Sequence, residues 1–427
     1  MIKKVVLVLL FCACCFNILY SQTSFIVSNH LDISIEEELL INDTALFHLL
    51  QIPFLGFDID MYSSPGISAF FETTDNNLLL DLEAYNNNVD DIAHHLIDIQ
   101  NSLLYYAFQH GQSVYSFGLN HRLFLEASLS KELVSLLIDG NYQYLNQYID
   151  FDNKNYVRAY NYFSLFFGYA KNLNDRFLLS AKLKLIKGVA EFGTNNQTLS
   201  FLFSDNFDTA NNPFSSQIST DIGYFANSDY NPLSNLGFAT DLFLDYNYNE
   251  RLKFYTQVSD LGFIIWKENQ YISQGDFKFE GLDYELDQIL STEFNNLQDT
   301  LADIFDIIES KGVNKLRLLP FDINLGVKYS FNDQKNQINT SYSIKKLYNT
   351  FLHTGQISYV RYFEQYNFSI IPSYSFNKFN YVNFSVMLNK KWQRRFYTNF
   401  YLENIFGFIN QSTTRSSGCG LELYILF

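Results

Sequence analysis

Strict alternation of apolar and polar residues is the feature that most limits how this chain can fold. Between Phe321 and Phe331 every odd position is apolar or aromatic, and the even positions carry Asp, Asn, Gly, Lys and Ser. The same period of two recurs in 177–185, 236–247 and 381–389. Because successive side chains of a β-strand point to opposite faces, these segments predict strands with one apolar and one polar face.

A soluble β-sandwich also alternates, so further properties must separate it from a membrane barrel. Many alternating segments are much longer than the globular average of about 5 or 6 residues. Short connections alternate with longer ones at 131–156, 193–235 and 267–317, and the chain contains 43 Phe and 31 Tyr. Short turns at one end, long loops at the other and abundant aromatic residues predict an all-β, transmembrane antiparallel β-barrel, with a soluble β-protein as the alternative.

The alternation predicts about fourteen strands, an even number that would leave both chain termini in the periplasm. One short turn is expected at Asn120-His121. Pro53 and Pro372 fall inside two expected strands, which should be kinked or bulged there because proline removes a ladder hydrogen bond. The expected strands are 46–62, 103–120, 122–130, 157–171, 176–192, 236–247, 251–266, 318–331, 336–346, 355–363, 366–376, 380–390, 394–404 and 417–427.

The two ends of the sequence carry export and assembly patterns. Lys3 and Lys4 precede an apolar run that is too short for a bilayer helix of ~20 residues, as in a secretory signal peptide. We therefore expect a signal peptide at 1–21, a periplasmic segment at 22–45 and the barrel at 46–427. The alternative is a lipoprotein signal, although the residues before the candidate cysteines fit it poorly. Phe427 closes an alternating last strand, the pattern that barrel assembly machinery prefers, or it ends an ordinary buried strand.

Composition and motifs exclude several function classes. The formal net charge of −16 argues against a nucleic-acid partner. After the signal only Cys419 remains, so an internal disulfide or a cysteine zinc site is excluded. The sequence contains no Gly-x-Ser-x-Gly, P-loop or Gly-x-Gly-x-x-Gly motif. We therefore assign no catalytic, cofactor-binding or metal-binding residue and expect no enzyme, although barrel enzymes can build sites from scattered loop residues.

Three segments have helical rather than strand periodicity. Apolar residues spaced by three and four in 286–311, followed by Gly312, predict an amphipathic helix with an acidic outer face in the longest loop. It would cover the barrel mouth, plug the lumen or dock a partner protein. Weaker patterns predict helices at 89–104 and 132–138. His94 and His95, in the one cluster of histidines and carboxylates, would then point to different faces of a helix and not converge on zinc.

Six charged residues should face the barrel lumen because they alternate with outward apolar positions. Cross-strand pairing would offset the cost of burying them, and a role in selecting a substrate is the alternative reading. These residues are Lys182, Lys184, Asp241, Asp245, Asp322 and Lys328.

Several stretches resemble a family of Bacteroidota outer-membrane barrels of unknown function, domain of unknown function 5723. They are Ile52 to Gly56, Tyr115 to Leu129, Phe167 to Lys171 with Leu183 to Gly188, and Ser259 to Trp266 followed by Phe279 to Leu282. The resemblance implies the fold and the outer-membrane location but no agreed activity. It therefore supplies no site residues.

Two main functional hypotheses remain from the sequence. The first is a plugged channel for a small or apolar solute, with an aromatic lumen and a tunnel or lateral gap. The second is a structural or docking barrel for a surface or secretion complex, with a sealed lumen. The expected partners are outer-membrane lipid, the barrel assembly machinery through the C-terminal strand, and an unidentified protein at the outer loops. No cofactor is expected.

Overall fold

The computed structural model of the chain describes residues 48–427, except 54, 67–70, 75–76, 141, 145–146, 151–153, 205–214, 228–230, 232, 280–307, 332–334, 380, 393–394 and 406–414. The expected signal peptide at 1–21 and the expected periplasmic segment at 22–45 lie outside the described residues. In the part of the chain that is described, no helix has the length and apolar character needed to cross a membrane.

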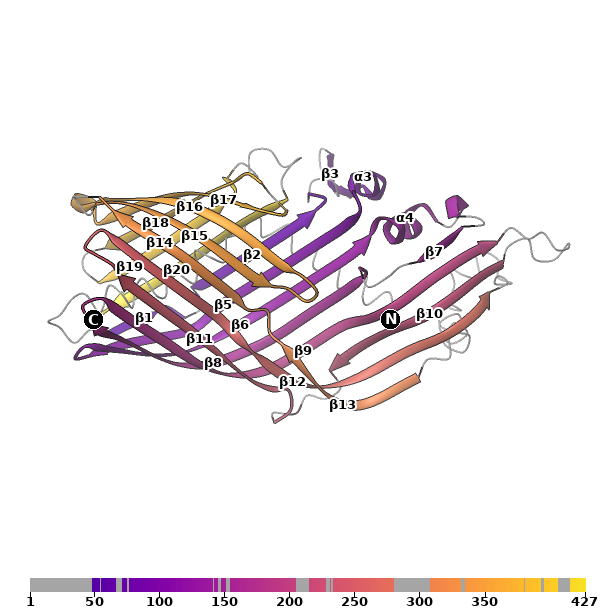
Figure 1. Ribbon diagram of the computed structural model, residues 1–427, viewed down its shortest axis with the longest axis horizontal. Coiled ribbons are helices and arrows are strands. Elements are labelled where there is room, and N and C mark those ends of the chain that lie inside the picture. Colours follow the sequence, from indigo (N-terminus) through magenta and orange to yellow (C-terminus); the bar gives the residue numbers. More distant parts are fainter. Residues whose placement is uncertain are drawn as a thin grey trace.

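The chain forms a closed antiparallel β-barrel with fourteen strand positions in its wall (Figure 1). The first position is shared by β1 (His48–Gln51) and β2 (Gly56–Ser64), and both pair with β5 on one side and β20 on the other, which closes the ring. The remaining positions follow in chain order: β5 (Ile92–His110), β6 (Ser113–Ser130), β8 (Tyr156–Asn174), β9 (Phe177–Ser204), β11 (Leu236–Asn247), β12 (Leu252–Phe279), β14 (Asp322–Ser330), β15 (Asn336–Lys346), β16 (Phe351–Phe363), β17 (Phe368–Asn377), β18 (Asn383–Trp392), β19 (Phe396–Glu403) and β20 (Ser416–Leu426).

The wall is apolar outside and polar inside. On β9, Leu183 and Leu185 are 54 % and 63 % exposed, whereas Lys182 and Lys184 between them are each 7 % exposed. A soluble barrel would bury the leucines and expose the lysines. The reversed pattern fits a barrel whose outer surface faces lipid, and it rules out the soluble alternative.

The two ends of the barrel differ. Short turns and the C-terminus lie at one end, which we call the turn end (Figure 1). The described chain also begins there, because His48 and Phe427 exchange backbone hydrogen bonds of 3.0 and 2.9 Å. Both ends of the described chain therefore lie at the turn end, as an even number of strands requires.

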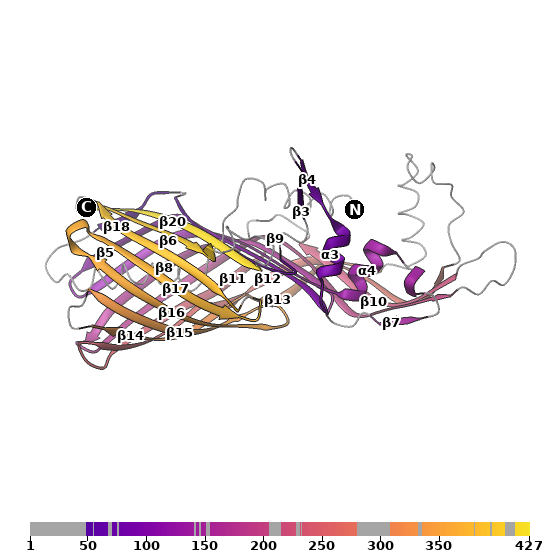
Figure 2. The same cartoon turned by 90° about the horizontal axis from the view of Figure 1, so that it is seen from above.

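A curved sheet extends beyond the other end, which we call the loop end (Figure 2). It forms because β9 and β12 are 28 residues long and continue past the wall. Above the end of β11, β10 (Ser215–Asn227) pairs with both of them. Two further strands, β7 (Tyr148–Asp150) and β13 (Ile308–Leu318), border this extension. Parts of the long connections 193–235 and 267–317 are thus strands.

Two helices pack together at the loop end, close to the hairpin of β3 (Phe71–Thr74) and β4 (Asn77–Leu80). The first, α3 (Leu82–Asn88), begins with Asp81 accepting a hydrogen bond from the Ala84 amide. The second, α4 (Lys131–Asp139), begins after Ser130, whose hydroxyl accepts from the Leu133 amide, and it confirms the helix expected at 132–138. Single 3₁₀ turns lie at η2 (Tyr142–Tyr144) and η3 (Glu364–Tyr366).

The helix expected at 89–104 is wrong, because residues from Ile92 onward form the first half of β5. Here both faces of the strand carry apolar residues, and polar residues such as Asp98 point inward. The apolar positions therefore fall by chance at helical spacing. The turn expected at Asn120-His121 is also wrong: both residues pair within β6, and the chain reverses at Gly111-Gln112, where Gly111 has a φ of +60°.

The helix expected at 286–311 is wrong at its end, because Ile308 to Lys311 belong to β13. Residues 286–307 lie outside the described residues. Gly312 does not end a helix; it has a φ of +64° inside β13, opposite a register shift in β12. Glycine tolerates this backbone conformation, which is common at β-bulges.

Both prolines disturb their strands as expected. Pro53 lies in the break between β1 and β2. In β17 the ladder to β16 skips Pro372, which remains paired with Val386 of β18. Because proline has no amide hydrogen, it fits the side of a strand where no ladder bond is made.

Candidate functional site: a charged constriction in the lumen

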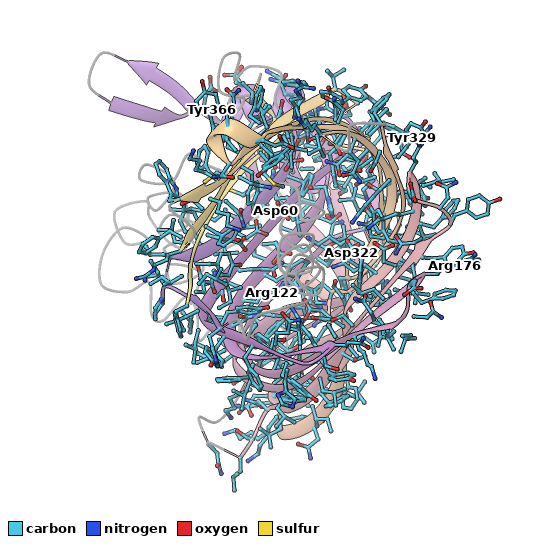
Figure 3. All side chains as sticks on the ribbon, turned by 90° about the vertical axis from the view of Figure 1, so that its left-hand side faces the viewer. Asp60, Arg122, Arg176, Asp322, Tyr329 and Tyr366 are labelled. Carbon is cyan, nitrogen blue, oxygen red and sulfur yellow. The ribbon has the colours of Figure 1, made fainter. Side chains whose placement is uncertain are left out.

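Charged side chains from opposite walls meet inside the barrel, at a level we call the charged constriction. Figure 3, viewed along the barrel from the turn end, shows Asp60 and Arg122 inside the ring of strands, with Tyr329 at its outer margin. The constriction consists of Asp60, Asp98, Arg122, Lys184, Asp241, Asp260 and Lys345.

Arg122 of β6 is the centre of this network. It donates to both oxygens of Asp98, with Nε–Oδ1 at 2.8 Å and Nη2–Oδ2 at 2.6 Å. Its third donor, Nη1, lies 2.6 Å from Asp260 on β12 and 3.3 Å from the Pro320 carbonyl. The fork on Asp98 fixes the guanidinium plane and directs Nη1 across the lumen towards Asp260.

Lys345 reaches the same carboxylate from the far wall. Its Nζ lies 2.8 Å from Asp98 on β5 and 3.8 Å from Asp60 on β2. Its strand, β15, stands on the opposite side of the ring from β5. Side chains just fill a barrel of about 8 strands, and a round barrel of fourteen would be wider. The contact therefore means that the lumen is narrowed here to the width of two side chains.

A β-bulge brings Asp260 into the constriction. The ladder between β11 and β12 shifts register between Thr240 and Leu242, and Asp260 has a φ of +57°. The Asp260 amide donates to Asp241 Oδ1 at 2.8 Å, and Lys184 Nζ bridges the two carboxylates at 2.7 and 2.6 Å. Bulges commonly redirect a side chain in this way. Asp260 thus binds both Lys184 and Arg122.

A small polar cavity of about 80 Å³ lies against the constriction. Its wall includes the carboxylates of Asp58 and Glu422 and the amides of Asn120 and Gln257. Lys182 also lines it, with Nζ over the rings of Tyr105 and Phe166 at 5.6 and 5.4 Å. A polar cavity of this size has room for a few water molecules or a solute of similar size. We call it the chamber.

Apolar layers lie on both sides of the charged constriction. One buried cluster, which includes Tyr105, Phe166, Phe243 and Tyr424, faces the turn end. The other includes Phe124, Tyr162 and Trp266 and faces the loop end. The aromatic lining expected for an apolar solute is thus present in parts of the lumen, whereas its narrowest level is charged.

Two turns at the loop end fold inward over the mouth. Tyr348, between β15 and β16, donates its amide to Glu126 on β6 at 2.8 Å. Phe379, between β17 and β18, stacks on His94 of β5 with ring centres 4.9 Å apart. Lys378 donates to Thr350 at 3.1 Å and so joins the two turns. These contacts cap the mouth with side chains from the opposite wall.

A second charged cluster attaches the extension sheet to the barrel. Phe225 of β10 is fully buried between Arg158 and Arg317, whose guanidinium carbons lie 4.2 and 4.4 Å from the ring centre. Arg317 forms ion pairs with Glu268 at 3.0 Å and Glu191 at 3.4 Å. This packing between cations and an aromatic ring holds β10 and β13 against β8 and β9.

The histidine pair lies on a strand and its side chains point to opposite faces. His94 faces inward and lies 3.2 Å from Glu126. His95 faces outward, with Nδ1 3.0 Å from the Ser63 hydroxyl and Nε2 3.0 Å from the Tyr85 hydroxyl. Because Tyr85 belongs to α3, its bond to His95 fixes this helix on the wall. Ser63 also donates to the Pro65 carbonyl. Within the described residues no three such groups converge as metal ligands.

The structure brings the six predicted lumen residues inside the barrel and pairs several of them. Lys184 binds Asp241, and Lys328 lies 3.9 Å from Asp245. Asp322 is buried near the constriction (Figure 3). Sequence reasoning missed Arg122 and Asp98, because the first was placed beside a turn and the second in a helix. The signal that could have found the true turn was Gly111.

These observations define the class of the protein: it is a fourteen-stranded transmembrane β-barrel with a lipid-facing apolar surface and a charged constriction in its lumen. The sequence matches the family of unknown function DUF5723 over residues 44–402, so the chain belongs to that family. No curated protein matches the sequence.

Solved structures match most of the chain at low similarity. The CymD monoaromatic hydrocarbon channel is 8 % identical, with 92 % of this chain and 91 % of that chain covered and a TM-score of 0.41. The Pseudomonas putida toluene transporter TodX is 9 % identical, with 91 % and 92 % covered and a TM-score of 0.37. A Pseudomonas aeruginosa FadL homologue is 10 % identical, with 89 % of each chain covered and a TM-score of 0.40. Likeness at this level carries no argument, and the class stated above rests on strand pairing and burial.

Proposed function

We propose that this protein is an outer-membrane channel for small polar solutes, held closed by the charged constriction. The contact of Lys345 with Asp98 across the lumen carries the proposal. It closes the path with side chains, which can change rotamer without disturbing the backbone of the wall. The chamber beside it provides polar groups that a passing solute would meet.

The chemistry of the constriction favours a functional role over a purely structural seal. Burying charged groups costs several kcal/mol per ion, and replacing a buried ion pair by apolar residues is often neutral or stabilising. The layers on both sides of the constriction show that this chain packs apolar side chains in its lumen. The ionisable residues of the charged constriction are therefore better explained by a path for solutes than by packing alone.

The same proposal includes location and partners. The apolar outer face would contact outer-membrane lipid, residues 1–21 would direct export, and β20 would be recognised by the barrel assembly machinery. The turn end would face the periplasm. We propose no enzymatic activity, since the charged groups of the constriction are engaged with one another in ion pairs on the inner face of the wall.

A docking barrel is the second candidate, favoured by the sheet that β7, β9, β10, β12 and β13 build beyond the rim. In that case the lumen would be sealed permanently and the extension would bind another protein. The two candidates differ in one measurable property, which is whether weakening the constriction produces a conducting pore.

Conductance in planar bilayers tests the channel. The wild-type protein should conduct rarely, and the double variant D98N/K345M, which removes the contact between opposite walls without changing net charge, should conduct much more often. The matched control is K335M/E364Q, which removes an exposed ion pair of 3.0 Å at the turn end and should behave as wild type. Both variants should keep heat-modifiable gel mobility. A folded D98N/K345M protein that conducts no more than the control would refute the channel and favour docking.

Location is tested by fractionation. The protein should be extracted from outer membranes with detergent and should migrate faster on gels before heating than after it. Recovery of the whole protein in the soluble fraction would contradict the proposed location.

A further inference from the structure

The buried interior of the barrel has a surplus of acidic groups. Among the described residues, ten carboxylate side chains and six lysines or arginines are buried. All lie on strands that form the barrel wall, and Glu268 lies where β12 continues into the extension sheet. On the inner face, the partly buried Asp241, Glu422, Lys253, Lys391 and Arg317 add two acids and three bases. Acidic side chains therefore outnumber basic ones on the inner face.

The basic groups are shared between several carboxylates. Arg122 binds Asp98 and Asp260, and Lys345 binds Asp98 and Asp60. Lys184 in turn binds two carboxylates. These three positive side chains therefore neutralise carboxylates of the constriction and offer little positive charge to an anion in transit.

Two of the surplus acids have no basic partner within ion-pair distance in the described structure. Glu403 of β19 is 2 % exposed, and its Oε1 accepts a hydrogen bond from the Asn383 amide. Its Oε2 is buried with no hydrogen-bond partner among the described residues. Asp322 of β14 is also buried, and it is the neighbour of Lys345 across the β14–β15 ladder. A positive charge entering the lumen would gain energy at both positions.

The chamber has the same preference. Asn120 Oδ1 and Gln257 Oε1 line it, are hydrogen-bond acceptors, and have no partner among the described residues. Gln257 is only 4 % exposed, and its amide nitrogen already donates to Ser259 at 3.0 Å. The charged part of the wall consists of three carboxylates, Asp58, Asp241 and Glu422, and two lysines, Lys182 and Lys184. Unpaired acceptors favour a solute that donates hydrogen bonds, such as an ammonium group or a hydrated cation.

We infer that the channel selects small cations and amine-bearing solutes and excludes anions. The inference rests on the proposed channel function and names its substrate class. In a narrow lumen with low-dielectric walls, one prevailing sign of charge focuses the field and concentrates counter-ions. The surplus carboxylates would attract cations, and the chamber would bind them through its acceptors while the constriction opens.

The test measures ion selectivity in a variant that conducts. D98N/K345M removes one acid and one base, so it leaves the acidic surplus unchanged. Its reversal potential in a KCl gradient should show that K⁺ permeates several-fold better than Cl⁻. Adding D322N and E403Q removes two surplus acids and should bring the permeability ratio towards one. The matched control adds E250Q and E364Q at exposed turn positions and should keep the cation preference.

Each outcome decides the inference. A ratio near one or a preference for Cl⁻ in D98N/K345M would overturn the cation selectivity while leaving the channel itself intact. Equal loss of selectivity in the D322N/E403Q and E250Q/E364Q backgrounds would also overturn it, because the surplus inside the lumen would then not be the cause. If no folded variant conducts, the proposed channel fails and the selectivity fails with it.

Discussion

The contact between Lys345 and Asp98 should contribute far more to stability than an exposed pair of the same kind. The two side chains are 4 % and 0 % exposed and lie 2.8 Å apart. Removing one partner of a buried pair costs roughly 3–5 kcal/mol, because the other charge stays buried without compensation. Here K345M leaves Asp98 bound to Arg122, and D98N leaves Lys345 bound to Asp60. We therefore expect each single variant to lower the free energy of unfolding by about 3 kcal/mol, the low end of that range.

The double variant tests whether this contact itself is responsible. Both single variants lose the same 2.8 Å interaction, so D98N/K345M should be less destabilised than the sum of the two, by a coupling energy of about 2 kcal/mol. The exposed pair Lys335–Glu364, with side chains 42 % and 59 % exposed, should show a coupling below about 1 kcal/mol.

The assay is equilibrium urea unfolding of the protein folded into lipid vesicles, followed by tryptophan fluorescence and by heat-modifiable gel mobility. Trp266 is fully buried in the lumen and should report the loss of packing. A coupling energy for Asp98 and Lys345 that is no larger than that for Lys335 and Glu364 would refute the reasoning, because burial would then not strengthen the interaction between the charges.

Two further predictions follow from the outer surface and the mouth. L185R places a charge on the lipid-facing side of β9, where Leu185 is 63 % exposed, and should destabilise the inserted barrel by roughly 2–4 kcal/mol in vesicle unfolding, whereas L185I should have little effect. A cost of L185R below that of L185I would contradict a lipid-facing surface. E126A removes the acceptor of the Tyr348 amide and should speed proteolytic cleavage within 347–350 severalfold. The control is E364A. Equal cleavage rates for the two variants would show that Glu126 does not hold this turn.

The period of two was sufficient to predict the barrel because it depends on one local fact, the opposite direction of successive side chains. In β14 the inward Asp322, Asn324 and Lys328 and the outward Leu325 could be assigned correctly from the sequence. The pattern failed in β5, where inward Leu96 and outward His95 reverse the usual order of polarity. A strand whose two faces are both mixed has no clear period, and helical spacing can then occur by chance.

The long connections were harder to predict because their strands lie beyond the rim of the barrel. In the extension, β10 is stabilised by pairing with the distal halves of β9 and β12, which are far from it in sequence. Neighbouring partners, rather than a lipid boundary, decide which residues are strand there. Local sequence carries little information about such pairing.

The sequence by itself determined that residues of one parity face lipid and those of the other face a lumen, and it placed Lys182, Lys184, Asp241, Asp245, Asp322 and Lys328 inside. Only the tertiary structure decided that a charged constriction crosses the lumen. The constriction joins Asp98 to Lys345, which are 247 positions apart in the chain, and the bulge at Asp260 turns a second acid towards Arg122. Such contacts depend on how far the ring is flattened and where each strand shifts its register, and neither property is encoded in the alternation of a single strand.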